Sequence, residues 1–332
     1  MSSPQASPTV SVVVCAWSED RWTDLQCAIE SIERQTERAT EIVLAVDHNE
    51  PLRLRAMQRF PDMVIVSNEG RRGLADARNA GIAAASGQII AFIDDDAVAS
   101  PTWLARLVAC FDDGNVIGVG GRVNAAWDGR RPRSFPSEFE WVVGCSYRGL
   151  PEARGPVRNM IGANMAFRRE VFEAVGGFRS DVGRVGARPL GCEETELCIR
   201  ARAWQPDATI LYEPSAQVSH RVTHARATWR YFVSRCIAEG LSKAAVVDSV
   251  GASSGLASER DYTLRTLPSG VARGVADAVV RGDVAGAGRA GAIVAGLGLT
   301  AGGYIAGRTS RSRAARLFGA RRVEPVLGGA HT

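Results

Sequence analysis

The chain has 332 residues, of which 45% are hydrophobic and 23% are charged, as in an ordinary globular protein. This length suits one large domain, or one domain with an appendage. The mild net charge of +4 excludes wholesale electrostatic binding of nucleic acid. The seven cysteines are scattered without a CxxC pair, which disfavours a zinc or redox site and predicts reduced thiols in the cytoplasm.

From residue 10 onward, strand patterns alternate with helix patterns, after a polar stretch over residues 1–9 that predicts a disordered tail. This βαβα order predicts an α/β domain over residues 10–245, with a mostly parallel, doubly wound sheet flanked by helices. A helix is also expected from Ala227 to Val250. The predicted strands are, in chain order, VSVVVCAW, EIVLAV, MVIVS, IIAFI, VIGVGG, GANMAF and ATILYEP.

The C-terminal region, residues 246–332, is rich in Ala, Gly, Val and Arg and predicts a helical extension. Residues 290–307 are uncharged, and six arginines follow between Arg308 and Arg322. Eighteen residues with six glycines fall short of the roughly 20 apolar residues of a membrane span. We therefore expect peripheral attachment to the anionic inner face of the plasma membrane. The alternative is a helical pair that packs on the domain or forms a homodimer contact.

Three consecutive aspartates, Asp94, Asp95 and Asp96, directly follow the apolar run IIAFI. A run of this kind predicts a strand buried on both faces, and open α/β sheets bind ligands beyond the carboxyl ends of their strands. Adjacent carboxylates repel one another unless a cation or donor groups compensate them. The cluster is therefore a candidate binding site, and the question is which cation it holds.

Three interpretations of the aspartates are open. They are acids that favour a helix N-terminus, the DxDxV loop of a haloacid-dehalogenase-type phosphatase, or a metal site for the two phosphates of a nucleotide sugar. The phosphatase usually carries its motif on the first strand and needs a later lysine. Here the motif follows the fourth strand, and the one lysine, Lys243, lies far along the chain.

Other features in the sequence favour the nucleotide-sugar interpretation. A small turn with Ala16 and Trp17 ends the first strand, Asp47 ends the second, and the helix GLADARNAG precedes the aspartates. A second acidic pair, Glu193 and Glu194, comes later. A non-catalytic sugar-binding module has no need of that second pair. A membrane scaffold would explain the C-terminal region but not this ordered series.

The series resembles family 2 glycosyltransferases with a GT-A fold, over about residues 10–240. The resemblance implies an inverting, metal-dependent transferase that uses Mn²⁺ or Mg²⁺ and a nucleotide-diphosphate sugar, with UDP as the expected nucleotide. The acceptor would be a hydroxyl of a glycan or of a polyprenyl-phosphate-linked sugar. FPSEFEWVVGCSYRGLP and SRCIAEGLSKA are similar to the glucosyl-dolichyl-phosphate glucuronosyltransferase-like subgroup. The motifs that carry the family resemblance are SVVVCAWSEDRW, VDHN, RGLADARNAG, FIDDDA, GANMAFRR and GCEETELCIR.

The resemblance also implies roles for individual residues. Asp47 would contact the base or ribose, Arg78 the nucleotide or diphosphate, and Asp94 the ribose or sugar. Asp96 would be the direct metal ligand, with His220 as a second ligand. The expected nucleotide-sugar-binding residues are Ala16, Trp17, Asp47, Arg78, Asp94 and Asp95.

The expected catalytic base lies in the second acidic pair. The family carries a Glu-Asp pair at the start of a helix near the acceptor, whereas this chain has Glu193 and Glu194. The resemblance implies that Glu194 removes the acceptor proton, with Glu193 as its backup. Trp141 and Asn164 are expected on the acceptor side.

Overall fold

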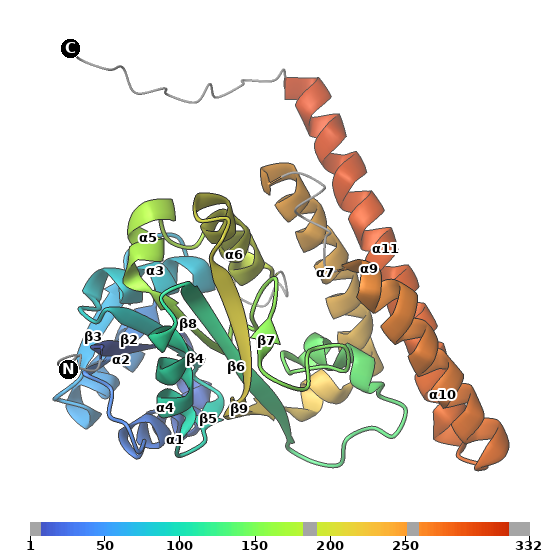
Figure 1. Ribbon diagram of the computed structural model, residues 1–332, viewed down its shortest axis with the longest axis horizontal. Helices are drawn as coiled ribbons and strands as arrows, with labels where there is room; N and C mark the ends of the chain where they lie inside the picture. The colour runs from blue at the N-terminus through green and yellow to red at the C-terminus, as the bar shows by residue number, and fades with distance from the viewer. Residues whose placement is uncertain (1–7, 182–190, 251–258, 319–332) are drawn as a thin grey trace.

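One mixed β-sheet forms the centre of the computed structural model, which describes residues 8–181, 191–250 and 259–318 (Figure 1). The strand order is β3-β2-β1-β4-β8-β6-β9-β5, and the short strand β7 pairs with β9. The strands are β1 (Val10–Ala16), β2 (Glu41–Asp47), β3 (Val64–Asn68), β4 (Ile89–Asp94), β5 (Ala97–Ala99), β6 (Val116–Trp127), β7 (Gly155–Pro156), β8 (Asn164–Arg168) and β9 (Thr209–Val222). The helices of the sheet region are α1 (Trp22–Glu33), α2 (Glu50–Arg59), α3 (Leu74–Ala84), α4 (Trp103–Val108), α5 (Arg169–Val175) and α6 (Glu193–Trp204).

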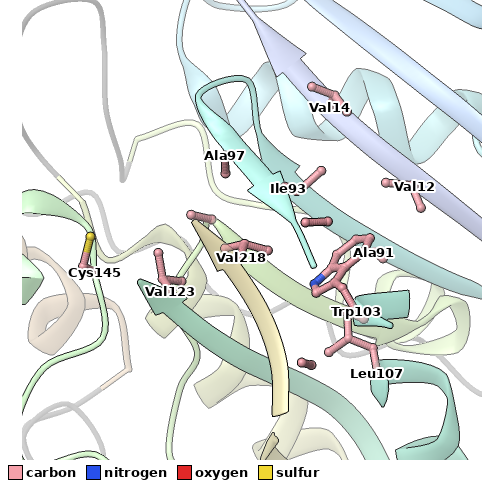
Figure 2. Packing of buried hydrophobic residues seen from close by; sticks show 14 of the residues in the cluster. Val12, Val14, Ala91, Ile93, Ala97, Trp103, Leu107, Val123, Cys145 and Val218 are labelled. Carbon is pink, nitrogen blue, oxygen red and sulfur yellow. The ribbon is translucent and has the colours of Figure 1, made fainter. Parts of the chain in front are cut away.

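The first four strands are parallel, as the sequence predicts, and β1, β2 and β4 are largely buried on both faces. In β1, Val12 and Val14 belong to a core cluster with α1 and α4, whereas Val13 belongs to a second cluster with α5 and α6. Figure 2 shows the ring of Trp103 of α4 beside Ala91 of β4, and in the neighbouring β1 Val12 is paired with Ala91 and Val14 with Ile93. The two clusters lie on opposite faces of the sheet. Strand β4 is therefore buried on both faces, and the aspartates lie at its carboxyl end.

The second half of the sheet is mixed, which corrects the prediction of a mostly parallel sheet. Strand β8 runs antiparallel to both β4 and β6, and β5 runs antiparallel to β9. The short β5 follows the aspartates directly and pairs Ala97 with His220 of β9. In addition, the backbone N–H of Arg221 donates to the carbonyl oxygen of Asp96 over 2.8 Å. This antiparallel pairing brings His220 to the aspartates although more than a hundred residues separate them.

The C-terminal helices lie together at one side of the sheet (Figure 1). They are α7 (Trp229–Val250), the three-residue α9 (Glu259–Asp261), the π-helical turn η5 (Tyr262–Thr266), α10 (Leu267–Val280) and α11 (Val284–Phe318). The boundary expected between residues 245 and 246 falls inside α7. Within the described residues, the segment Val284–Ser310 of α11 is the one helix long and apolar enough to cross a membrane. Residues 1–7 of the tail predicted over residues 1–9, and the arginines beyond residue 318, lie outside the described residues.

Candidate active site

Arginine side chains surround the aspartate cluster. Asp94 is the last residue of β4, and Asp95 and Asp96 form the buried turn before β5. Nη1 of Arg21 lies 2.7 Å from Oδ1 of Asp95 and 3.2 Å from Oδ2 of Asp96. Arg226 reaches Oδ2 of Asp96 over 3.4 Å. These guanidinium groups offset part of the repulsion between adjacent carboxylates.

Asp94, Asp96 and His220 form a candidate metal site, since one ligand atom of each lies within 4.8 Å of the other two. Nε2 of His220 is 3.1 Å from Oδ1 of Asp96. That spacing is close to the ~3 Å between neighbouring ligands of an octahedral ion with bonds of about 2.1 Å. Two carboxylates suit Mn²⁺ or Mg²⁺, and an imidazole ligand favours the transition metal Mn²⁺ of the two. The buried Oδ2 of Asp95 has no hydrogen-bond partner among the described residues. The residues therefore fit a divalent cation.

Asp96 and His220 form an ion pair in which each charge stabilises the other. Burial acts against both charges, yet the imidazole of His220 holds the pKa of Asp96 far below its usual range. In turn the Asp96 carboxylate raises the pKa of His220 to about 10 against the effect of burial. Burial, despite the nearby Arg21, raises the pKa of Asp95 to about 7. The paired imidazole must lose its proton to bind a metal.

A pocket of about 290 Å³ lies in front of the aspartates and fits the expected nucleotide side. Ala16 and Trp17 line it at the end of β1, and Asp47 lines it at the end of β2. Asp47 accepts hydrogen bonds from Nδ2 of Asn68 over 2.7 Å and from the backbone N–H of Gly73 over 3.0 Å. The loop between β3 and α3 thereby fixes this carboxylate at the pocket. The structure brings together the predicted residues Ala16, Trp17, Asp47, Asp94, Asp95 and Asp96.

A second pocket, of about 270 Å³, contains Glu193, Glu194, Trp141 and His220. It shares Leu74, Asp94 and Arg226 with the first pocket, so the two meet at the candidate metal site.

Arg78 links the two carboxylate groups. Its guanidinium is buried and lies 3.4 Å from Asp94 and 3.1 Å from Glu193, and it donates to the carbonyl oxygen of Gly162 over 3.1 Å. Arg78 lines the second pocket and not the first, and its contact with Asp94 places it beside the aspartates, where the two pockets meet.

The two glutamates at the start of α6 differ in their surroundings. Glu193 is buried, with Oε1 held by Arg78 and Oε2 without a hydrogen-bond partner in the described part of the chain. Glu194 is half-buried and lines the second pocket. Burial and the neighbouring Glu193 raise the pKa of Glu194 to about 8. A carboxylate with a raised pKa beside a pocket is suited to accept a proton near neutral pH.

The structure places one predicted residue elsewhere and adds two that were missed. Asn164 is fully buried in β8, where it accepts from Nε1 of Trp103 over 2.8 Å and donates to two backbone carbonyls, so it supports the sheet rather than contacting an acceptor. Arg21 and Arg226 contact the aspartates directly, although nothing in their local sequence signals this role. Their contacts with the aspartates depend on where the fold places the turn after β1 and the turn after β9.

Comparisons with known proteins identify the family. Residues 11–176 match the model of the family described as glycosyl transferase family 2. The chain is also 37% identical over 238 residues to a glucosyl-dolichyl phosphate glucuronosyltransferase of Haloferax volcanii, covering 70% of this chain and 76% of that protein. The chain belongs to glycosyltransferase family 2. Family membership confirms the predicted enzyme class, and neither the phosphatase nor the non-catalytic sugar-binding alternative finds support.

Solved structures confirm the GT-A fold of this family 2 glycosyltransferase. A mannosyltransferase of Pyrobaculum calidifontis, solved with GDP-Man and Mn²⁺, matches with a TM-score of 0.58 and 19% identity, over 89% of this chain and 87% of that one. GalNAc-T7, solved with UDP, GalNAc and Mn²⁺, matches with a TM-score of 0.52 and 20% identity. That match covers 78% of this chain and 55% of the other.

Proposed function

We propose that this enzyme transfers a sugar from a nucleotide-diphosphate donor, UDP-linked, to a hydroxyl of a lipid-phosphate-linked sugar, with inversion at the anomeric carbon. The observation that carries the proposal is that the two pockets meet at Asp94. One pocket holds the aspartates and Asp47, and the other holds the acidic pair of α6. The name of the Haloferax relative supports the lipid-linked class of acceptor.

The donor pocket positions the nucleotide and its diphosphate. Asp47 and Trp17 would contact the nucleoside, and the aspartate turn would face the diphosphate. Asp94, Asp96 and His220 would hold a divalent Mn²⁺ or Mg²⁺ ion, which offsets the negative charge of the leaving diphosphate.

Glu194 is the proposed general base. Its carboxylate takes the proton of the acceptor hydroxyl as that oxygen forms a bond to the anomeric carbon. The bond between the anomeric carbon and the diphosphate oxygen breaks, and the electron pair leaves with the nucleotide diphosphate. Attack from the face opposite the diphosphate inverts the anomeric configuration. Glu193 is tied to Arg78 and serves to hold the start of α6.

The substitution Glu194→Gln tests this assignment, with Glu193→Gln as the comparison. Glu194→Gln keeps the size of the side chain but removes the base, so transfer should fall by roughly a hundredfold or more. Donor affinity, measured by calorimetry with UDP and Mn²⁺, should stay unchanged. A fully active Glu194→Gln enzyme together with an inactive Glu193→Gln enzyme would reverse the two roles.

We also propose that the enzyme binds peripherally to the inner face of the plasma membrane. Five apolar side chains of α10 and α11 are at least 60% exposed: Val279, Val280, Val284, Val294 and Ile305. The sequence then adds six arginines between residues 308 and 322, which suits an anionic lipid surface.

Flotation with anionic vesicles at low salt tests the membrane proposal on the full chain. The wild type should float, and a Val294→Asp, Ile305→Asp double variant should float much less, because charges then replace apolar surface. Equal flotation of the two proteins would contradict this surface. A concentration-dependent dimer mass in the wild type, without flotation, would indicate a contact between two copies.

A further inference from the structure

The pocket that contains Glu194 extends to the C-terminal helices. Phe139 and Trp141 line it from the segment before β7, and Tyr262, Leu267 and Leu297 line it from η5, α10 and α11. Phe139, Leu267 and Leu297 carry no polar side-chain group. Sugar hydroxyls placed against these three residues would lose hydrogen bonds to water without replacement. This part of the pocket is therefore suited to an apolar group.

Specific contacts hold this apolar wall in place. Nε1 of Trp141 donates to the hydroxyl of Tyr262 over 3.0 Å, and that hydroxyl donates to the carbonyl oxygen of Glu138 over 2.5 Å. The rings of Phe139 and Trp141 pack with their centres 5.4 Å apart. Position 296 must be glycine, because a Cβ there would collide with the ring of Phe139. The helix α11 is thus fitted closely against the catalytic domain beside the pocket.

Cationic side chains line the same pocket from α7. Arg235 and Lys243 are two helical turns apart on one face of this helix, and Glu239 lies between them at 3.6 Å and 3.7 Å. Glu239 also accepts from the thiol of Cys192, the residue that precedes the acidic pair of α6. Guanidinium and ammonium groups next to the base are suited to a phosphate on the acceptor. One pocket therefore combines a base, cations and an apolar wall.

We propose that Phe139, Trp141, Tyr262, Leu267 and Leu297 form a subsite for the apolar chain of a lipid-phosphate-linked acceptor. This inference rests on the proposed function and assigns part of that acceptor to the C-terminal helices. Leu297 is 39% exposed, whereas Leu267 and Phe139 are buried, so Leu297 lies where the chain enters. Val294 and Ile305, both at least 60% exposed, lie on the same helix as Leu297.

Calorimetry on the full chain, without membranes, tests the subsite with farnesyl phosphate and dimethylallyl phosphate as probes. The two probes share a phosphate and differ in chain length. The wild type should bind farnesyl phosphate about tenfold or more tightly than the short probe, because the longer chain buries more apolar area. Equal affinities for the two probes would overturn the proposal.

Three substitutions sharpen this test. Leu297→Asp and Leu297→Trp should both abolish the tighter binding of the longer probe. The first variant adds a charge to the subsite, and the second fills it. Leu54→Asp in α2 is the control, because Leu54 is 49% exposed and belongs neither to this pocket nor to the exposed face of α11. Tighter binding of farnesyl phosphate by Leu297→Trp would mean non-specific apolar adsorption and would also overturn the subsite.

Transfer assays separate this proposal from the proposed function. With a short-chain and a long-chain sugar phosphate as acceptors, Leu297→Trp should raise the KM for the long acceptor only. If transfer occurs and the two acceptors keep equal KM values in the wild type, the subsite is wrong and glycosyl transfer stands. If farnesyl phosphate binds in a Leu297-dependent way but no lipid-linked sugar accepts, the subsite stands and the proposed acceptor is wrong.

Discussion

Two neighbouring glycines of α11 should respond to alanine with opposite signs. A Cβ at Gly302 would have no atom within 4 Å, whereas a Cβ at Gly303 would collide with the backbone of Ile237 in α7. The two positions share one helix and one residue type. Any difference between their alanine variants therefore reports on the packing of α11 against α7.

The magnitudes follow from helix propensity and from overpacking. Gly302→Ala should stabilise the protein by about 1 kcal/mol, because alanine loses less backbone entropy in a helix. Gly303→Ala gains the same amount but forces two backbones apart, which costs about 1–3 kcal/mol. Since the atoms met are backbone atoms, the upper part of that range applies, and the net loss should be about 1–2 kcal/mol.

Thermal and urea unfolding of the full chain measure the effect. For a chain of this size Tm should rise by about 2 °C in Gly302→Ala and fall by about 2–4 °C in Gly303→Ala. Equal stabilisation by both variants would show that α11 does not pack on α7 in solution. That result would also remove the wall on which the acceptor subsite depends.

Two further predictions concern Arg78, which connects the two pockets, and Glu194, the proposed base. Arg78→Met should cost about 3–5 kcal/mol of unfolding free energy in urea titrations, because it leaves the buried Glu193 without its partner. Adding Glu193→Gln should recover part of that loss, and an unchanged loss would mean that the pair is not coupled. Because burial and Glu193 raise the pKa of Glu194 to about 8, kcat/KM should climb about tenfold per pH unit at low pH and level off above pH 8. A flat profile from pH 6 to pH 9 would contradict a base role for Glu194.

The parallel half of the fold was predictable because β1, β2 and β4 are largely buried on both faces. Val12, Val13 and Val14 of β1 need apolar partners on two sides, and that requirement appears in the sequence as an unbroken apolar run. The second half was not predictable in the same way. Strand β8 lies between β4 and β6 with reversed direction, and a short buried strand of five residues carries no mark of its direction.

Side chains at strand ends were located well, whereas those from turns were not. Asp47, Asp94 and Asp96 follow strands that the sequence reveals, so the topology brings them to one edge. Arg21 and Arg226 reach the aspartates from turns, and their roles depend on tertiary placement alone. Asn164 shows the opposite error, because it was expected on the acceptor side whereas its amide completes hydrogen bonds inside the sheet.

The C-terminal helices were predicted as helices, and packing on the catalytic domain was one of the predicted alternatives, but the sequence did not place them beside the second pocket. Glycines that lower the hydropathy of residues 290–307 also permit close packing, as at Gly296 and Gly303. The sequence shows the lower hydropathy but not the close packing. Packing on Phe139 and α7 makes these helices part of the second pocket, so the function of the region depends on both of its faces.

Metal-dependent turnover of the donor tests the central claim most directly. Purified full-length protein, stripped with a chelator, is supplied with a panel of nucleotide sugars with and without Mn²⁺, and release of nucleotide diphosphate is measured. The wild type should turn over at least one UDP-sugar when Mn²⁺ is restored. An Asp96→Ala variant that unfolds at the wild-type temperature should show no such turnover. Metal-independent turnover by the wild type, or unchanged turnover by Asp96→Ala, would contradict a metal site formed by Asp94, Asp96 and His220.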